Sequence, residues 1–409
     1  MVEEVIASTL LPSAVVDLFL LSDDGIKTAE ILDKDWRLAR VTLNIEKTGI
    51  EAATQKYEDE ASPDLVIIEV DDIGDGFLEK LEALAGNCVE GTEAIIVGPE
   101  NDVELYRKLV GLGVSDYLVS PLDQDKLIGV ISKTLINKIG LSDCRLVAVI
   151  GSKGGVGTTS VSQILAWDIS EKLKQKTMLL DAAGSWGTIG ISFGMEPSST
   201  FIEAIRTGTE GSDEDMERMY YKASGRLSLL ATGGDPLLEE EINTDDYERL
   251  VDRIMLKYPV VVVDLSGASN EVRNRILSRA HEITIVSTPL LPALRGAKTL
   301  MVEVKNLRGN SDMVDLVVNM KGIAGASEVP VADIETALDL KTNAVISYEP
   351  KIFAEAEASG KPIGGNSKAS NIWGELMDIS YRAADIGEED VEGSVKQKSG
   401  SLLAKLIGR

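Results

Sequence analysis

The sequence predicts an α/β protein built from two doubly wound domains, each with a parallel β-sheet. Two observations lead to this fold class. Short β-branched and apolar runs alternate with helical patterns along most of the chain, which is typical of strands joined by crossover helices. The chain also has 409 residues, which is more than one hydrophobic core usually organises.

The first domain is expected at residues 1–136. Helical patterns separate five short apolar runs that we expect to be strands: residues 15–21, 40–45, 64–70, 94–97 and 117–119. The stretch that follows is polar and contains one glycine, so a linker is expected at residues 137–144.

The second domain is expected at residues 145–385, followed by a tail at residues 386–409. Its expected strands are near-continuous apolar runs, as in strands that are buried on both faces of a sheet. They are residues 146–150, 177–180, 227–230, 260–263, 283–287 and 314–318.

Composition excludes several kinds of function. The formal net charge is −26, and such a surface repels DNA phosphates and anionic lipids, so general nucleic-acid binding is not expected. Cys88 and Cys144 lack the paired spacing of a disulfide framework or a zinc site. This cysteine usage fits a reducing compartment, so a cytoplasmic location is expected. His281, the only histidine, lies near no nucleophile motif. No run of about 18 apolar residues occurs, so we expect a soluble protein.

The most specific signal is a glycine-rich segment between the expected strand 146–150 and a helical pattern. It consists of Gly151, Ser152, Lys153, Gly154, Gly155, Val156, Gly157, Thr158 and Thr159. Its four glycines allow successive backbone N–H groups to point into one concavity, and the following helix N-terminus adds partial positive charge. The segment is therefore expected to bind phosphate. A purely structural turn is the alternative.

The segment departs from the common phosphate-loop template G-x-x-x-x-G-K-[ST]. It keeps Gly151, Gly157 and Thr159, but Thr158 stands where the template has lysine, and a lysine occurs earlier, at Lys153. In this respect it resembles the ParA/MinD family of deviant P-loop ATPases.

The resemblance implies that ATP and Mg²⁺ are bound. In the family this lysine reaches across a dimer interface to the partner's nucleotide, so ATP binding and homodimer formation are expected to be coupled. An ordinary solvated lysine is the alternative. The expected nucleotide-binding residues are Gly151, Lys153, Gly154, Gly155, Val156, Gly157, Thr158, Thr159 and Asn319.

Two acidic residues follow expected strands and are candidate metal residues together with Thr159. Asp181 comes after strand 177–180 and Asp264 after strand 260–263, and a carboxylate at this edge of a buried strand can hold Mg²⁺ directly or through water. A simple loop-starting aspartate is the alternative for each.

The resemblance to the ParA/MinD family also predicts roles for two further positions. Asn319 follows strand 314–318, where the family contacts adenine; an asparagine that starts a turn is the alternative. Members that hydrolyse ATP usually have a second aspartate two residues beyond Asp181, where this chain has Ala183. Slow or absent hydrolysis is therefore expected, with Lys153 and Asp181 as the candidate catalytic residues.

Within the ParA/MinD family, the chain resembles one group of proteins more specifically. A loop with threonine at position 158, the later segments 349–353 and 358–362, and a receiver-like domain in front look like the CpaE/TadZ family. Members of that family localise and help assemble the Tad (Flp) type IVb pilus machinery. This implies pilus secretion machinery proteins as partners, and a cell pole or the inner face of the membrane as a location.

The first domain resembles a response-regulator receiver, a flavodoxin-like fold, in the acidic pair at residues 23–24 and in the segment 113–123. Its phosphorylation chemistry is not expected to operate. Glu69 stands at the phospho-acceptor position, Gly98 at the switch-hydroxyl position and Ser120 at the lysine position. A docking role is therefore expected for this pseudo-receiver, with an inert structural domain as the alternative.

The tail ends in a short basic amphipathic segment at residues 394–409. Such a segment can make a peripheral membrane contact or dock in a partner's groove, and a frayed, solvated tail is the alternative.

Three function classes remain after these observations. The favoured one is an ATP-dependent spatial organiser of a pilus machine. A ParA-type chromosome or plasmid partitioning ATPase would need a basic DNA-binding face. A response regulator with an ATPase output domain would need the receiver residues that are missing.

Overall fold

The computed structural model describes residue 11 and residues 14–74, 76–139, 144–235, 242–308, 313–366 and 374–386. The chain divides into two compact units, Met1–Ser142 and Asp143–Arg409, and each is described by itself.

The first unit contains a five-stranded parallel sheet in the order β2-β1-β3-β4-β5. Its strands are β1 (Ala14–Phe19), β2 (Val41–Glu46), β3 (Leu65–Glu69), β4 (Glu93–Gly98) and β5 (Asp116–Val119). All five expected strands are present, with ends that differ by one or two residues. This strand order is that of flavodoxin-like doubly wound folds.

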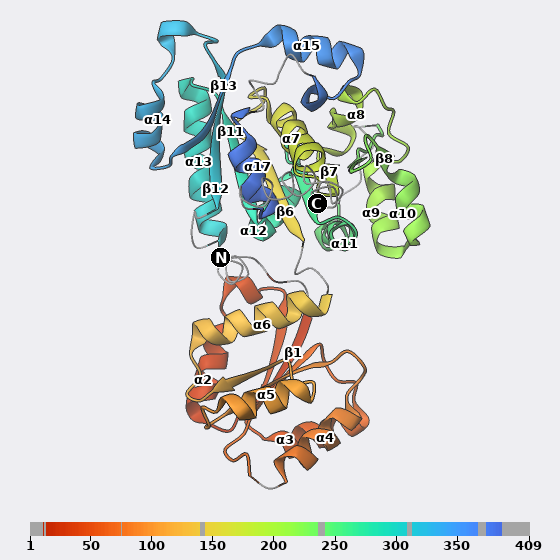
Figure 1. The fold of residues 1–409 in the computed structure, drawn as a ribbon, viewed down its shortest axis with the longest axis vertical. Coiled ribbons are helices and arrows are strands. Elements are labelled where there is room, and N and C mark those ends of the chain that lie inside the picture. The colour runs from red at the N-terminus through yellow and green to blue at the C-terminus, as the bar shows by residue number, and fades with distance from the viewer. Residues whose placement is uncertain are drawn as a thin grey trace, which may run out of the picture. The chain divides into compact units, whose positions relative to one another are not determined.

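Helices cover both faces of this sheet. They are α2 (Asp23–Leu32), α3 (Ile50–Asp59), α4 (Phe77–Asn87), α5 (Val103–Gly111) and α6 (Gln124–Ile139), with a short 3₁₀ turn η1 (Trp36–Leu38). One core cluster joins the sheet to α2 and α6, and a second joins it to α3, α4 and α5. Figure 1 shows α6 and α4 on opposite sides of the strands.

Helix α6 extends further than the sequence indicated. Residues 137–139 were expected in the linker but continue the helix, and residues 140–143 lie outside the described residues. Leu135 is fully buried, and the Lys138 ammonium donates to the Asp64 carboxylate at 2.8 Å. These contacts with the rest of the unit stabilise a last turn whose polar sequence suggested a loop.

The second unit contains an eight-stranded sheet in the order β13-β12-β11-β6-β10-β7-β9-β8. Its strands are β6 (Arg145–Gly151), β7 (Thr177–Asp181), β8 (Tyr221–Lys222), β9 (Leu227–Leu230), β10 (Val260–Asp264), β11 (Glu282–Ser287), β12 (Val314–Lys321) and β13 (Thr342–Ser347). All pairs are parallel except β8 with β9. The six expected strands are present, and β8 and β13 were not expected.

The helical segments of the second unit are α7 (Thr158–Trp167), the π-helical turn η2 (Asp168–Lys172), η3 (Gly184–Trp186), α8 (Ile189–Ser192), α9 (Phe201–Glu210), α10 (Asp213–Met219), α11 (Thr244–Met255), α12 (Asn270–Arg279), α13 (Leu291–Arg308), η4 (Gly325–Ser327), α14 (Val331–Leu338), α15 (Pro350–Ser359), η5 (Ile363–Gly365) and α17 (Met377–Ala384). None of the helices in the described part of the chain is long and apolar enough to cross a lipid bilayer.

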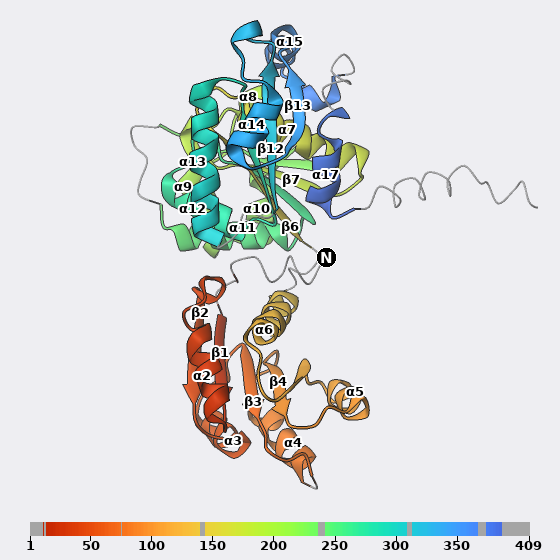
Figure 2. The same cartoon turned by 90° about the vertical axis from the view of Figure 1, so that its left-hand side faces the viewer.

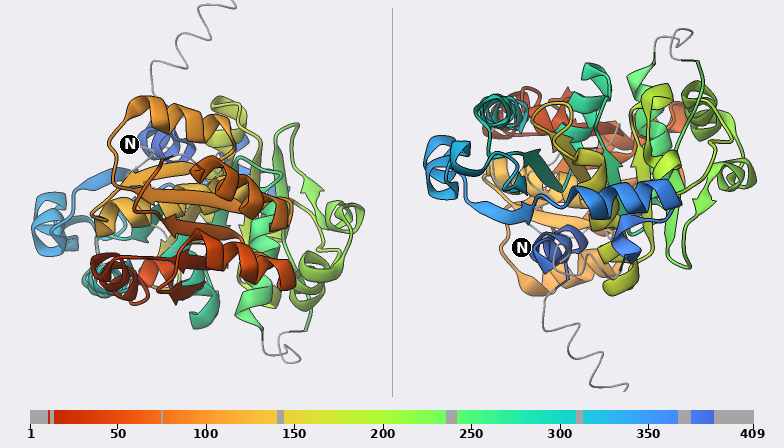
Figure 3. Two further views of the ribbon diagram at one scale, coloured as in Figure 1. Left: turned by 90° about the horizontal axis from the view of Figure 1, so that it is seen from below. Right: turned by 90° about the horizontal axis from the view of Figure 1, so that it is seen from above.

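Two helical layers enclose this sheet. One core cluster joins it to α7, α15, η5 and α17, and on the other face α11, α12 and α13 contact β10, β6 and β11. Figure 2 shows α12 and α13 on one side of the strands and α7 and α17 on the other. In the right-hand view of Figure 3, α15 lies across the end of the sheet.

Candidate functional site

The glycine-rich loop leaves the sheet at its centre. Strand β6 lies between β11 and β10, and its last residue, Gly151, opens the loop that leads into α7. The Ser152 amide donates to the Val286 carbonyl of β11 at 2.8 Å, which fixes the start of the loop on the neighbouring strand. The loop is therefore held at the carboxyl edge of a rigid sheet, where α/β folds bind ligands.

Two glycines of the loop are required by its geometry. Gly157 has a φ of 91°, a left-handed conformation, and a Cβ there would collide with the Asn319 amide nitrogen. A Cβ at Gly151 would overlap with the Thr158 hydroxyl oxygen. In the described structure, no side chain caps the N-terminus of α7, so the backbone N–H groups of its first turn are open to an anion.

A cavity of about 470 Å³ lies at the loop. It is lined by Ile150, Gly151, Ser152, Lys153, Gly154, Gly155, Gly157, Thr158, Thr159, Ser160, Leu265, Ser266, Gly267, Ala268, Arg273 and Leu300. Eight of the nine residues of the predicted phosphate loop, all but the buried Val156, thus line one concavity.

A second cavity of about 270 Å³ adjoins the first, because Gly157 and Ser160 line both. Its other lining residues are Asn319, Met320, Ser347, Tyr348, Glu349, Pro350, Phe353, Ala354 and Glu357. One compartment is thus lined by backbone amides and hydroxyl groups, and the other contains aromatic side chains. The pair matches the phosphates and the base of a nucleotide.

Lys153 is exposed at the rim of the loop. Its ammonium donates to the carbonyl oxygen of the next residue, Gly154, at 2.9 Å. Thr158, at the template's lysine position, is buried, so the loop places no cation there.

Asn319 has a structural role that the sequence did not indicate. It is buried; its amide nitrogen donates to the Val156 carbonyl at 2.8 Å, and its amide oxygen accepts from the Met320 N–H at 2.8 Å. It therefore ties the loop to the end of β12 while also lining the second cavity.

Asp264 and Thr159 are placed on either side of Ser266. The Thr159 and Ser266 hydroxyl oxygens are 2.8 Å apart, and the Ser266 N–H donates to Asp264 Oδ1 at 3.0 Å. Oδ2 of Asp264 is buried without a hydrogen-bond partner in the described structure. Burial raises the pKa of this carboxyl, and the nearby hydroxyl groups of Thr159 and Ser266 oppose that shift.

This donor set fits a magnesium ion. Mg²⁺ usually takes one or two protein oxygens and fills its other positions with water and phosphate oxygens. The described residues contain no group of three or more His, Cys, Asp or Glu side chains that could hold a metal. An unpaired carboxylate oxygen near a loop hydroxyl therefore suits an ion that arrives with a nucleotide. Ser266, which sequence analysis missed, stands two residues after a strand-end aspartate, and that spacing is the signal that could have found it.

Asp181 lies beside Asp264 in the sheet but is turned toward its own loop. The two residues are register partners on β7 and β10. The Asp181 carboxylate accepts from the backbone N–H groups of Ala183 at 3.1 Å and Ile189 at 3.3 Å. Burial, and then the charge of Asp264, raise the pKa of Asp181 to about 7. Ala183 is buried and brings no carboxylate to this edge.

The first unit has its own polar cavity of about 510 Å³ at the end of β3, lined in part by Glu69. Glu69 Oε2 accepts from the backbone N–H groups of Leu21 at 2.8 Å and Ser22 at 2.9 Å, and Oε1 accepts from the Ser22 hydroxyl at 2.7 Å. This carboxylate fastens the loop between β1 and α2. A Cβ at Gly98 would lie 2.6 Å from the Tyr117 hydroxyl oxygen, so a hydroxyl-bearing residue does not fit there.

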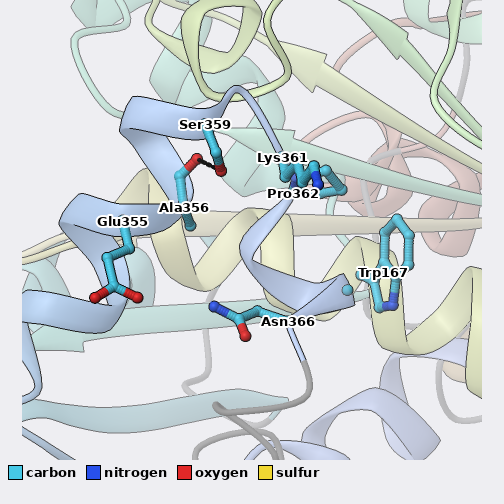
Figure 4. Close-up of a pocket in the computed structure, with 8 residues that line it drawn as sticks. Trp167, Glu355, Ala356, Ser359, Lys361, Pro362 and Asn366 are labelled. Atoms are coloured by element: carbon cyan, nitrogen blue, oxygen red, sulfur yellow. Dashed lines mark hydrogen bonds between the residues drawn. The ribbon is translucent and has the colours of Figure 1, made fainter.

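A larger cavity, of about 550 Å³, lies elsewhere on the second unit, beside the end of α7 (Figure 4). Trp167, Glu355, Lys361 and Asn366 contribute to its wall, and none of its lining residues belongs to the glycine-rich loop. The Ser359 hydroxyl shown there donates to the Ala356 carbonyl at 2.9 Å, within α15. Volume alone therefore does not identify the site.

The curated proteins that this chain resembles in sequence include site-determining proteins. No family model matches the chain. The septum site-determining protein MinD of Thermotoga maritima is 23% identical over 231 residues, which is 55% of this chain and 83% of that protein. The flagellum site-determining protein YlxH of Helicobacter pylori is 22% identical over 178 residues, 43% of this chain and 58% of that protein.

Among solved structures, a ParA family ATPase from Chlorobium tepidum matches with a TM-score of 0.53 and 19% identity, over 58% of this chain and 98% of that one. The pilus assembly protein CpaE from Caulobacter crescentus is 31% identical, with a TM-score of 0.30, over 31% of this chain and 97% of that one. The chain thus contains the α/β fold of the ParA-type P-loop ATPases, as the sequence predicted.

Proposed function

We propose that this protein is an ATP-binding dimeric switch, with weak or absent hydrolysis, that localises or helps assemble a Tad/Flp type IVb pilus machine. The observation that carries the proposal is the pair of adjoining cavities at the glycine-rich loop, one lined by backbone amides and one by aromatic side chains. Similarity in sequence to MinD supports the nucleotide-binding class.

In the proposed complex, the backbone of residues 151–159 binds the phosphates of ATP. Thr159 and Asp264 hold the accompanying Mg²⁺, which would neutralise phosphate charge, and Asp181 contributes at most through water because its oxygens face its own loop. The base occupies the cavity beside Asn319 and Phe353.

Hydrolysis is proposed to be slow because none of the described residues that line the cavity at the loop has a carboxylate to orient an attacking water. Ala183 is apolar and buried, and Asp181, with a pKa raised to about 7, accepts hydrogen bonds from the backbone of residues 183 and 189. A site that binds ATP without cleaving it quickly suits a switch whose state lasts as long as the nucleotide stays bound.

Dimer formation is proposed to complete the site. Position 158 carries no charge, and Lys153 is exposed at the rim, where it could reach a nucleotide in a second subunit. This arrangement is the one implied by the ParA/MinD resemblance, and it makes ATP the signal for association.

The pilus role rests on the resemblance of the loop, of segments 349–353 and 358–362, and of the front domain to the CpaE/TadZ family. The names of two relatives concern placement of a septum and of a flagellum, which favours a positioning role. The carboxylate of Glu69 is hydrogen-bonded to the loop after β1, so it does not serve as a phospho-acceptor. The first unit is therefore proposed to dock to pilus secretion machinery proteins instead of receiving a phosphoryl group. The tail at 394–409, a candidate membrane contact, lies outside the described residues.

A partitioning ATPase is less well supported, because a net charge of −26 disfavours DNA. A response regulator would need a free phospho-acceptor and a switch hydroxyl, whereas Glu69 is hydrogen-bonded to the loop after β1 and Gly98 leaves no room for a hydroxyl-bearing side chain.

The nucleotide site is tested by titration calorimetry with ATP and Mg²⁺ on Gly157→Ala. Strain at a φ of 91° and the collision with Asn319 should lower ATP affinity about tenfold or more. Gly91→Ala is the matched control, because Gly91 also has a φ of 91° but lies in the first unit with open space around it. Equal ATP affinity in both variants would contradict the assignment.

A further inference from the structure

The cavity of about 470 Å³ at the glycine-rich loop, here called the phosphate cavity, is lined by a cationic side chain that no sequence motif indicated. Arg273, on α12, lines this cavity together with the glycine-rich loop. Its side chain is 26% exposed, and its Nη2 makes an ion pair with Glu303 Oε1 at 2.8 Å. Its Nε is buried and has no hydrogen-bond partner in the described part of the chain. The guanidinium therefore retains donor capacity at the edge of the site.

One face of α13 sets the position of this guanidinium. Gly296, Leu300 and Glu303 are spaced four and then three residues apart, so they lie on the same side of the helix. Gly296 packs so closely on the loop that a Cβ there would collide with the Ser152 carbonyl oxygen. Leu300 lines the cavity, and Glu303 holds Arg273. The helix that supports the loop thus also carries the carboxylate that positions the arginine.

The charge at the cavity is opposite to that of the molecule as a whole. Among the described residues, its lining includes Lys153 and Arg273 and no carboxylate side chain, whereas the chain has a net charge of −26. The Lys153 ammonium is bonded to the loop's own Gly154 carbonyl at the exposed rim. Of the two cationic side chains that line the cavity, Arg273 is therefore the one that comes from outside the loop.

We propose that Arg273 binds the terminal phosphate of ATP within the same subunit, and so adds a positive charge to the one that Lys153 of a second subunit is proposed to bring. Glu303 is its positioning residue. The inference rests on the proposed function and deepens it, because it names the group that distinguishes ATP from ADP. A planar guanidinium with several donors suits bidentate contact with a phosphate. The competing account is that Arg273 and Glu303 only join α12 to α13.

The test measures the affinity of full-length protein for fluorescent N-methylanthraniloyl ATP and ADP in Mg²⁺. Wild-type protein should prefer the ATP analogue. Arg273→Gln should lower affinity for the ATP analogue about tenfold or more, as expected for loss of a charged hydrogen bond, and change affinity for the ADP analogue little. Arg275→Gln is the matched control, since Arg275 also lies on α12 but pairs with Asp245 away from the cavity.

Glu303→Gln separates the two accounts, because it breaks the same ion pair and keeps the cation. If Arg273 binds phosphate and Glu303 positions it, Glu303→Gln weakens the preference for the ATP analogue, but less than Arg273→Gln does. If the pair only joins two helices, both variants lose stability alike and neither changes the preference, which overturns the inference. Equal losses of ATP and ADP affinity in Arg273→Gln overturn it too. If wild-type protein binds neither analogue, it is the proposed function that fails.

Discussion

At the scale of single residues, the account depends on a few oxygen atoms at the carboxyl edge of the second sheet. Thr159, Ser266 and Asp264 are linked by contacts of 2.8 and 3.0 Å, the second of which ends at Oδ1 of Asp264. The other carboxylate oxygen, Oδ2, is buried and has no hydrogen-bond partner among the described residues. We interpret these three residues as the part of a magnesium site that the protein provides. Asp181, beside it, is committed to the backbone of its own loop.

Replacing Thr159 tests this interpretation. Thr159→Ala removes the hydroxyl, so ATP affinity in the presence of Mg²⁺ should fall about 10- to 100-fold, the range seen when a metal site loses a supporting group. Thr159→Ser keeps the hydroxyl and should bind as wild type does. Calorimetry with Mg²⁺ and with a chelator provides the readout. If Thr159→Ala keeps the full effect of Mg²⁺ on ATP affinity, the hydroxyl is not a ligand.

The sequence indicated which residues lie around the glycine-rich loop better than it indicated the contacts between them. The loop glycines, Thr159 and Asp264 could be predicted because strand, turn and helix follow one another along the chain. The bond from Asn319 to the Val156 carbonyl and the position of Arg273 could not, because each joins residues more than 100 positions apart. Such contacts depend on the order of strands in the sheet, which local periodicity does not specify.

At the scale of elements, helix α13 supports the loop through Gly296. Gly296→Ala should raise intrinsic helix propensity by about 1 kcal/mol, yet lower ATP affinity about tenfold because the new methyl group pushes on Ser152. Gly129→Ala on α6 is the control, since a Cβ there meets no neighbour, and it should stabilise its unit without affecting ATP. Thermal unfolding and calorimetry together check both effects. An unchanged ATP affinity in Gly296→Ala would show that the loop does not depend on this contact.

Elements were predictable where burial makes their pattern continuous. The central strands of both sheets are buried on both faces, and all eleven expected strands are present. The strand β13 was missed because it is an edge strand that buries only Ala344 and Ile346. The end of α6 was placed too early because Lys138 is held by a distant residue, Asp64.

At the scale of the whole molecule, one unit carries the proposed nucleotide site and the other resembles a receiver but lacks the residues of receiver phosphorylation. In the first unit, Glu69 fastens the loop after β1 and Gly98 leaves no room for a hydroxyl-bearing side chain. The second unit carries a glycine-rich loop whose lysine is exposed at the rim. We therefore interpret the front unit as a docking unit and the ATP site as the part that changes state.

The most direct test of the central claim is the molar mass in solution, measured by light scattering with and without ATP and Mg²⁺. The account predicts a change from 43.9 kDa to twice that value on ATP binding. Lys153→Ala should abolish the change, whereas Lys305→Ala, an exposed lysine on α13, should not. A mass that is the same with and without ATP, in a protein that calorimetry shows to bind ATP, would contradict the proposed switch.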